Sequence, residues 1–188
     1  DEEVPTEAYS VIIPGGFPEK YAEHISNSRK SLMSLNKFRK SGFIYAECGG
    51  MMILGASIED EDGICHEMSG ILPFSSKKGK LSVGYRNIKG VKDSPIIKRN
   101  QSIRGHEFHY WEIESFLSNP DINTNCKNIK PYSPWEIKSW DTKYKKEGWS
   151  ENNLHASWIH LHLPSSPEAS TNFINATQGA FLGDVIDY

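Results

Sequence analysis

Residues 42–54, GFIYAECGGMMIL, form the stretch of sequence that decides the fold. Its first five residues are mostly apolar, as in a strand that is buried on both faces, and its last four predict a short helix. Cys48 stands between the two and is followed by Gly49 and Gly50, which let a chain turn sharply. A buried strand that turns directly into a helix is typical of an open α/β sheet, in which ligands bind beyond the carboxyl ends of the strands.

The preceding residues extend the same pattern. Residues 9–13 form a β-branched apolar run that stops at Pro14, Gly15 and Gly16, and residues 19–40 repeat apolar side chains at helical spacing. Strand, helix, strand, turn and helix in this order predict parallel strands joined by a right-handed crossover. We therefore expect an α/β fold with a mostly parallel central sheet. The length of 188 residues predicts a single domain over residues 1–188.

The rest of the chain contains three more candidate strands and one helix. Residues 83–88 and 102–111 alternate like strands, and residues 154–160 form another apolar candidate. Residues from about 119 to 148 are rich in Pro, Asn, Trp and Lys, which predicts a long surface loop. A closing helix is expected over residues 168–178, directly after a proline.

Composition limits the classes of function. Hydrophobic residues make up 37% and charged residues 24%, as in ordinary soluble globular proteins. A net charge of −3 gives no basic footprint, so we expect no nucleic-acid partner. No apolar run approaches the roughly 18 residues of a membrane span, and the acidic first residues do not start a signal peptide. We therefore expect no membrane association and a cytoplasmic location.

The cysteine count agrees with a reducing compartment. Cys48, Cys65 and Cys126 fit neither a secreted disulfide framework nor the paired spacing of a zinc site. Cys65 and Cys126 lack any special setting, and we treat both as structural. The turn after Cys48 presents helix N–H groups that could stabilise a thiolate or an oxyanion. A free cysteine is also commonly a small buried hydrophobe, so the turn by itself supports a nucleophile and a core residue equally.

A nucleophilic cysteine needs a base, and two histidine-rich segments could supply it. His160 and His162 lie at the end of a predicted strand, at the same sheet edge as Cys48, and a period of two places them on one side of that strand. His106 and His109 lie in a second segment, residues 104–110, where they flank Glu107 and Phe108. Any single histidine is more often a satisfied polar residue. The spacing of these residues is not the helical His-Glu-x-x-His pattern, and we expect no metal.

Four segments together indicate a family. They are IPGGFPE at residues 13–19, AECGG at 46–50, RGHEFHY at 104–110 and ASWIHLH at 156–162. In this order they resemble the class I glutamine amidotransferases, and more narrowly the C-terminal glutaminase domains of cobyrinic acid a,c-diamide synthases. The resemblance runs from about residue 9 to 178. It implies a flavodoxin-like, three-layer α/β fold.

The resemblance also implies a reaction. Cys48 would attack the side-chain amide of glutamine to form a thioester, with His160 as the acid and base. Backbone N–H groups of Gly49 and of Gly15 or Gly16 would hold the oxyanion. Ammonia would pass to a synthetase domain of the same polypeptide, which uses ATP and Mg²⁺ to activate the a- and c-acetate carboxylates of a corrinoid acid. The sequence has no Gly-x-x-x-x-Gly-Lys-Ser/Thr loop and does not begin with Met, so we expect this second domain outside the chain and no cofactor in this one.

Two positions depart from the wider class. His162 and Met52 stand where those enzymes commonly carry Glu and Gln, so the third member of the catalytic set is open. Glu107 is a candidate substitute, with His106 and His162 as supporting candidates. Other interpretations stay open: a catalytically silent interaction module, or the same chemistry on a related tetrapyrrole acid. A cysteine peptidase has no evident use for the segments at residues 13–19 and 104–110. A homodimer is compatible with the sequence.

Overall fold

The structure, a computed structural model, describes residues 1–115, 133–139 and 144–182. Its central sheet has the order β1-β2-β10-β9, in which the first three strands are parallel and the last is antiparallel. These strands are β1 (Ser10–Ile13), β2 (Phe43–Glu47), β10 (Leu154–Ser157) and β9 (Trp149–Glu151). The predicted α/β class with parallel β1 and β2 is confirmed, and β10 brings residues more than 100 positions away alongside β2.

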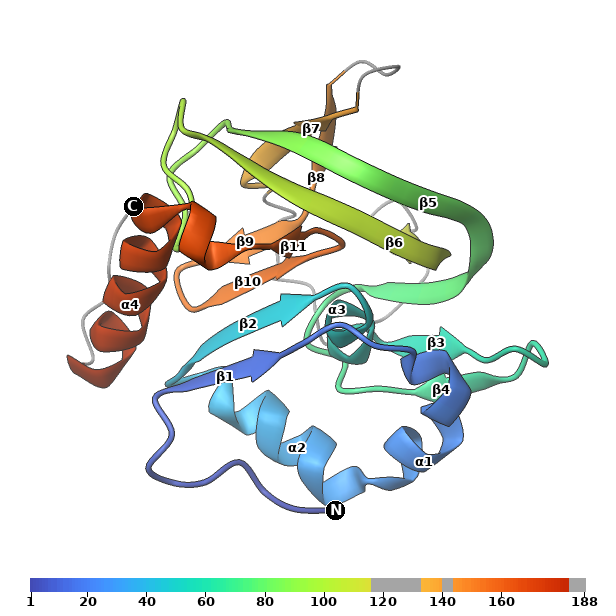
Figure 1. Cartoon of the computed structure of the whole chain (residues 1–188). Helices are drawn as coiled ribbons and strands as arrows, with labels where there is room; N and C mark the ends of the chain where they lie inside the picture. Colours follow the sequence, from blue (N-terminus) through green and yellow to red (C-terminus); the bar gives the residue numbers. More distant parts are fainter. Residues whose placement is uncertain (116–132, 140–143, 183–188) are drawn as a thin grey trace.

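β2 is buried on both faces, as its apolar run predicts. Phe43 and Tyr45 belong to a core beneath α4 (Pro167–Leu182), whereas Ile44 and Ala46 belong to a second core on the side of α2 (Arg29–Phe38). All four side chains are at most 3% exposed. In Figure 1, α1 (Ala22–Asn27) and α2 lie on one side of β1 and β2, and the long hairpin of β5 (Phe74–Gly90) and β6 (Ser102–Ser115) lies on the other. β2 is therefore held from both sides, and the turn at its end is rigidly placed.

The helix predicted over residues 19–40 is three shorter elements. These are η1 (Pro18–Tyr21), α1 (Ala22–Asn27) and α2 (Arg29–Phe38). Ser28 leaves the helical region with φ −79° and ψ 57°; its N–H donates to His24, and its carbonyl accepts from Leu32. Asn and Ser form local hydrogen bonds that compete with helix continuation, which explains the break that apolar periodicity did not reveal.

A second, mostly antiparallel sheet was only partly predicted. The strands expected at 83–88 and 102–111 are confirmed, as parts of β5 (Phe74–Gly90) and β6 (Ser102–Ser115). The sheet has the order β11-β6-β5-β3-β4, with β7 paired to β5 and β8 paired to β7. Its shorter strands are β3 (Ser57–Glu59), β4 (Cys65–Glu67), β7 (Trp135–Lys138), β8 (Lys145–Glu147) and β11 (His160–Leu161).

Two sequence predictions are corrected in this sheet. The surface loop expected at 119–148 contains β7 and β8, and Trp135 is fully buried; residues 116–132 and 140–143, including Cys126, lie outside the described residues. The strand expected at 154–160 ends at Ser157, and the chain then crosses to β6 as β11. Strand alternation therefore does not run through to His162, which instead precedes the short 3-10 helix η3 (Leu163–Ser165). The closing helix is confirmed as part of α4.

Among the described residues, no helix combines the length and apolar character that a membrane crossing needs.

Candidate active site

Cys48 occupies the strained turn between β2 and α3 (Gly49–Leu54). Its backbone has φ 49° and ψ −116°, a conformation that side-chain-bearing residues rarely adopt. Its N–H donates to the carbonyl of Ser157 at 2.7 Å, so β10 holds the turn in place. The side chain is 5% exposed, and Sγ lies 3.4 Å from the carbonyl oxygen of Phe108 on β6. This is the geometry of a nucleophile elbow, in which strain presents one side chain above the sheet.

Glycines let the loop after β1 pack against this turn. A Cβ on Gly50 would lie 2.2 Å from the carbonyl oxygen of Ile13, and one on Gly49 would lie 2.5 Å from that of Gly16. A Cβ on Gly15 would lie 2.3 Å from Cε1 of His160. Side chains at these three positions would collide with the loop or with His160. Gly16 is exposed and would meet nothing within 4 Å, so its position leaves open space beside the turn.

His160 is brought to Cys48 from β11. The imidazole forms a hydrogen bond with Cys48, and its Nδ1 lies 3.3 Å from Oε2 of Glu47. The hydrogen bonds to Cys48 and Glu47 raise the pKa of His160 to about 10, against the opposing effect of burial. His106 stacks on its other side, with ring centroids 4.7 Å apart at 14°. The pair predicted from sequence is therefore assembled, with His160 able to accept and hold the thiol proton.

Glu47 is the carboxylate beside His160. Its Oε1 accepts hydrogen bonds from the Tyr45 hydroxyl at 2.5 Å and from the N–H of Leu161 at 3.0 Å. Burial alone would favour the neutral acid, but hydrogen bonds from His160, Leu161 and Tyr45 lower the pKa of Glu47. Burial and the Glu47 charge raise the pKa of Tyr45 well above its usual value, so its hydroxyl stays a donor.

Glu107, the substitute considered from the sequence, is engaged elsewhere. It lies 2.6 Å from Nε of Arg86 and 2.7 Å from Nε2 of His109. Although burial opposes ionisation, these partners lower the pKa of Glu107 to about 2. The His109 ring stacks on Trp158 at 3.9 Å, so Glu107 braces β6 against the segment that leads to His160. Glu107 and His106 are neighbours on β6, so their side chains face opposite sides of the strand, and the Glu107 side chain is buried.

The remaining predicted residues lie around the pair. His106 contacts His160 through ring stacking, whereas His162 is exposed at the start of η3 and lines the rim of a cleft. Met52 is 2% exposed and belongs to the core beneath α3. Cys65 is exposed on β4 and is a free thiol. Within residues 1–115, 133–139 and 144–182, no group of three or more His, Cys, Asp or Glu side chains could hold a metal ion.

Sequence reasoning missed a buried carboxylate that positions the histidine segment. Oε2 of Glu147 accepts hydrogen bonds from Nε1 of Trp135 and from the hydroxyl of Ser157, each at 2.7 Å, and Oε1 accepts from the N–H of Trp158 at 2.9 Å. The Ser157 hydroxyl in turn accepts from the N–H of Ile159 at 2.9 Å. This network fixes the crossing from β10 to β11. Nothing in the local pattern around Glu147 predicts it, because the partners are distant in sequence.

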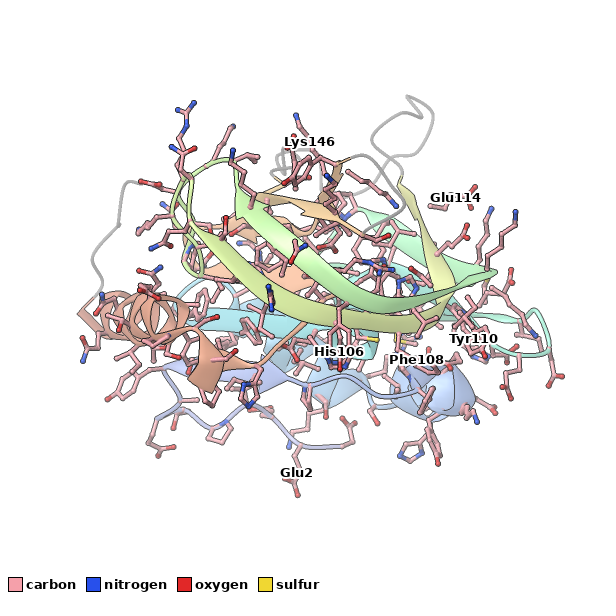
Figure 2. The ribbon with its side chains drawn as sticks, turned by 45° about the horizontal axis from the view of Figure 1, so that its top comes forward. Glu2, His106, Phe108, Tyr110, Glu114 and Lys146 are labelled. Atoms are coloured by element: carbon pink, nitrogen blue, oxygen red, sulfur yellow. The ribbon has the colours of Figure 1, made fainter. Side chains whose placement is uncertain are left out.

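An open cleft of about 980 Å³ adjoins His160. His160 and His106 form part of its wall, and Arg86, Arg104 and Lys138 give it a positive lining. Figure 2 shows His106, Phe108 and Tyr110 projecting from the same side of β6. Phe108 and Tyr110 are 41% and 44% exposed, and Tyr85, opposite His106 on β5, is 87% exposed. The surroundings of His160 and His106 thus combine a basic cleft with exposed aromatic side chains.

Solved structures with a similar fold are glutamine amidotransferases. One is 12% identical, with a TM-score of 0.55, and the match covers 90% of this chain and 79% of that one. Another, from Thermotoga maritima, is 16% identical, with a TM-score of 0.55, and the match covers all of this chain and 70% of the other. At this identity the likeness concerns the fold, and it agrees with the predicted amidotransferase architecture.

Several relatives by sequence share one name. The cobyrinate a,c-diamide synthase of Syntrophotalea carbinolica is 29% identical over 188 residues, which is 95% of this chain and 38% of that protein. Those of Salmonella typhimurium and Listeria innocua are 30% and 36% identical, each over 89% of this chain and 35% of the relative. The chain thus spans little more than a third of these relatives. Residues 1–168 match the CobB/CobQ-like glutamine amidotransferase domain, and the chain therefore belongs to that family.

Proposed function

We propose that this chain is the glutaminase part of a glutamine-dependent amidotransferase of the cobyrinate a,c-diamide synthase type. The observation that carries the proposal is the assembly of Cys48 on a strained turn with His160 and a carboxylate at hydrogen-bonding distance. Relatives that share about 30% of its sequence over most of its length bear that name.

The geometry supports a thioester route. His160 takes the proton of the Cys48 thiol, and the sulfur attacks the amide carbon of glutamine. His160 then gives this proton to the nitrogen as the carbon–nitrogen bond breaks and ammonia leaves. Water, deprotonated by His160, hydrolyses the thioester and releases glutamate. The N–H of Gly49, in the first turn of α3, and one from the loop at Gly15 or Gly16 would hold the oxyanion.

Ammonia released here would serve a synthetase domain of the same polypeptide. The relatives are nearly three times as long as the matched region, which leaves ample length for such a domain. We propose that it uses ATP and Mg²⁺ to activate the a- and c-side-chain carboxylates of cobyrinic acid. Exposed aromatic side chains beside the nucleophile, notably Tyr85, Phe108 and Tyr110, support docking of that domain at the mouth of the site. We expect the isolated chain to hydrolyse glutamine slowly.

A glutamine-analogue electrophile tests the proposal. Diazo-oxo-norleucine should label Cys48 in the full-length protein, and peptide mass spectrometry should place the adduct on that residue. Cys48→Ser should abolish glutamine-dependent amidation while leaving amidation from free ammonia intact, because only the ammonia source is lost. Absence of labelling in the full-length protein would favour a catalytically silent module instead.

A further inference from the structure

The sequence left the third member of the catalytic set open, and the structure points to a residue that the family comparison does not. We propose that Glu47, directly before the nucleophile, is the positioning residue that orients His160 and stabilises its imidazolium form. The inference rests on the proposed glutaminase chemistry and concerns the same site.

Both oxygens of Glu47 are engaged. Oε2 faces Nδ1 of His160 at 3.3 Å, and Oε1 accepts from the Tyr45 hydroxyl at 2.5 Å and from the N–H of Leu161 at 3.0 Å. A carboxylate held from two sides cannot rotate freely, so it fixes the plane and direction of the imidazole. With Nδ1 directed at Glu47, Nε2 is the ring nitrogen left for the Cys48 thiol.

The backbone ties this arrangement together. Glu47 is covalently adjacent to Cys48, and its hydrogen-bond donor Leu161 is adjacent to His160. In addition, β2 pairs with β10 so that Glu47 lies opposite Ser157, and the N–H of Cys48 donates to the Ser157 carbonyl. Glu47 and Cys48 are thus fixed by the register of the parallel strands β2 and β10, and His160 follows β10 by two residues on β11, which pairs with β6.

Other charged groups around His160 do not substitute for Glu47. From β6, His106 stacks on the ring at 4.7 Å and offers no negative charge. From β10, His155 stacks on Tyr45; its burial lowers its pKa to about 3, which keeps it neutral. Glu107 is paired with Arg86 and His109. Among the described residues, Glu47 is the carboxylate that forms an ion pair with His160.

The consequence concerns the proton. When the Cys48 proton moves to His160, the ring becomes positive, and the Glu47 charge stabilises that state without taking up a proton itself. A neutral amide at position 47 would retain most of the packing but lose this stabilisation. The thiolate would then form less readily at neutral and acidic pH. This effect can be measured without glutamine and without the synthetase domain.

The experiment is alkylation of Cys48 by iodoacetamide in this chain between pH 5 and pH 9, with the modified peptide quantified by mass spectrometry. In the unaltered chain we expect substantial alkylation at pH 6. Glu47→Gln should slow alkylation at that pH by at least about tenfold. The reason is that an opposite charge this close changes the pKa of its partner by about one or more, which is a tenfold change in the protonation equilibrium. Glu47→Asp should retain part of the rate, and Tyr45→Phe should cause a smaller loss in the same direction.

Two variants define the limits. The alkylation rate of His160→Ala gives the reactivity of the Cys48 thiol without a base. Glu107→Gln tests the rival carboxylate, and we expect this variant to show the same pH profile of Cys48 alkylation as the unaltered chain. The proposal is overturned if Glu47→Gln keeps the original profile while His160→Ala changes it, or if Glu107→Gln produces the larger loss. Far-ultraviolet circular dichroism and a urea midpoint near that of the unaltered chain confirm that each variant is folded.

This outcome is separable from that of the proposed function. If the alkylation profile responds to Glu47 but diazo-oxo-norleucine never labels Cys48 in the full-length protein, the glutaminase assignment fails and the positioning role stands. If labelling and glutamine-dependent synthesis are normal in Glu47→Gln, the positioning role fails and the glutaminase assignment stands.

Discussion

Cys48 has a backbone conformation that is unfavourable for a residue with a side chain. Its φ of 49° and ψ of −116° suit glycine, yet the proposed reaction needs a thiol there. The turn is kept because β2 is buried on both faces, α3 begins immediately, and Ser157 accepts the Cys48 N–H. Strain of this kind persists only where the surrounding structure determines the conformation, and it is typical of functional sites.

Comparison of Cys48→Gly with Cys48→Ala should reveal this strain. Both variants lose the sulfur and its contacts, but only glycine relieves the backbone. We expect Cys48→Gly to have a free energy of unfolding about 1–3 kcal/mol higher than Cys48→Ala. Urea denaturation followed by circular dichroism measures both. Equal stability of the two variants would show that the turn carries no strain.

Among the structural elements, the crossing from β10 to β11 does most to form the site. β10 completes the parallel sheet beside β2, and after two residues the chain pairs with β6 in the other sheet. A Cβ on Gly105 would lie 2.3 Å from Ile159 and 2.7 Å from the His160 carbonyl oxygen, so glycine on β6 permits this close approach. The crossing ends with His160 above Cys48, held by the buried Glu147 network.

Removal of the Glu147 carboxylate should strongly destabilise the folded chain at the crossing from β10 to β11. Glu147→Ala leaves the Trp135 indole N–H, the Ser157 hydroxyl and the Trp158 N–H without their acceptor in a buried place. Unsatisfied buried donors are costly, and we expect a loss of about 3 kcal/mol or more in the free energy of unfolding.

The matched control for this change is Glu114→Ala on β6. Its carboxylate pairs with Lys77 at 3.0 Å, and both side chains are about half exposed. Surface pairs of this kind contribute less than about 1 kcal/mol. Urea denaturation measures both variants. A loss for Glu147→Ala as small as that for Glu114→Ala would contradict the network's role.

In the whole molecule, two sheets meet at the nucleophile. The parallel sheet supplies Cys48 and Glu47, and the antiparallel sheet supplies His160, His106 and the Phe108 carbonyl. The hairpin of β5 and β6, green to yellow in Figure 1, crosses above the end of β2. The side of the hairpin that carries His106, beside His160, also carries the exposed aromatic side chains of Tyr85, Phe108 and Tyr110, a patch of the kind that often marks an interaction surface.

Substitution of Tyr85 tests whether this face receives the proposed synthetase domain. In the full-length protein, Tyr85→Ser should reduce glutamine-dependent amidation by about tenfold, the order expected for an aromatic interface residue. Amidation from free ammonia should be unchanged, because that reaction needs only the synthetase. Steady-state rates with each nitrogen source measure the effect.

Met33 on α2 provides the control for Tyr85. It is 72% exposed and lies on the opposite side of the central sheet from the hairpin, as Figure 1 shows for α2. Met33→Ser should leave both rates unchanged. Equal effects of the two substitutions would indicate a general loss of stability, and no effect of Tyr85→Ser would place the docking surface elsewhere.

Local sequence determined the parts of the fold that depend on interactions between residues close together in the chain. The run before Cys48 predicted β2 because an apolar stretch bounded by glycines is buried as a strand. Their positions near strand ends made Cys48 and His160 candidates, and the resemblance to the amidotransferases selected them. The break at Ser28 and the strand at Trp135 were missed, because a single polar residue and a strand inside a polar region carry weak local signals.

Only the tertiary structure decided which carboxylate serves His160. In the sequence, Glu107 lies in a histidine-rich motif and was a candidate for this role, whereas Glu47 precedes Cys48 at the end of an apolar run and was not considered. Strand pairing reversed this: β2 and β10 are parallel neighbours, and β11 turns His160 back over their ends. Partners separated by more than 100 residues are chosen by sheet register and buried hydrogen bonds, which local patterns do not contain.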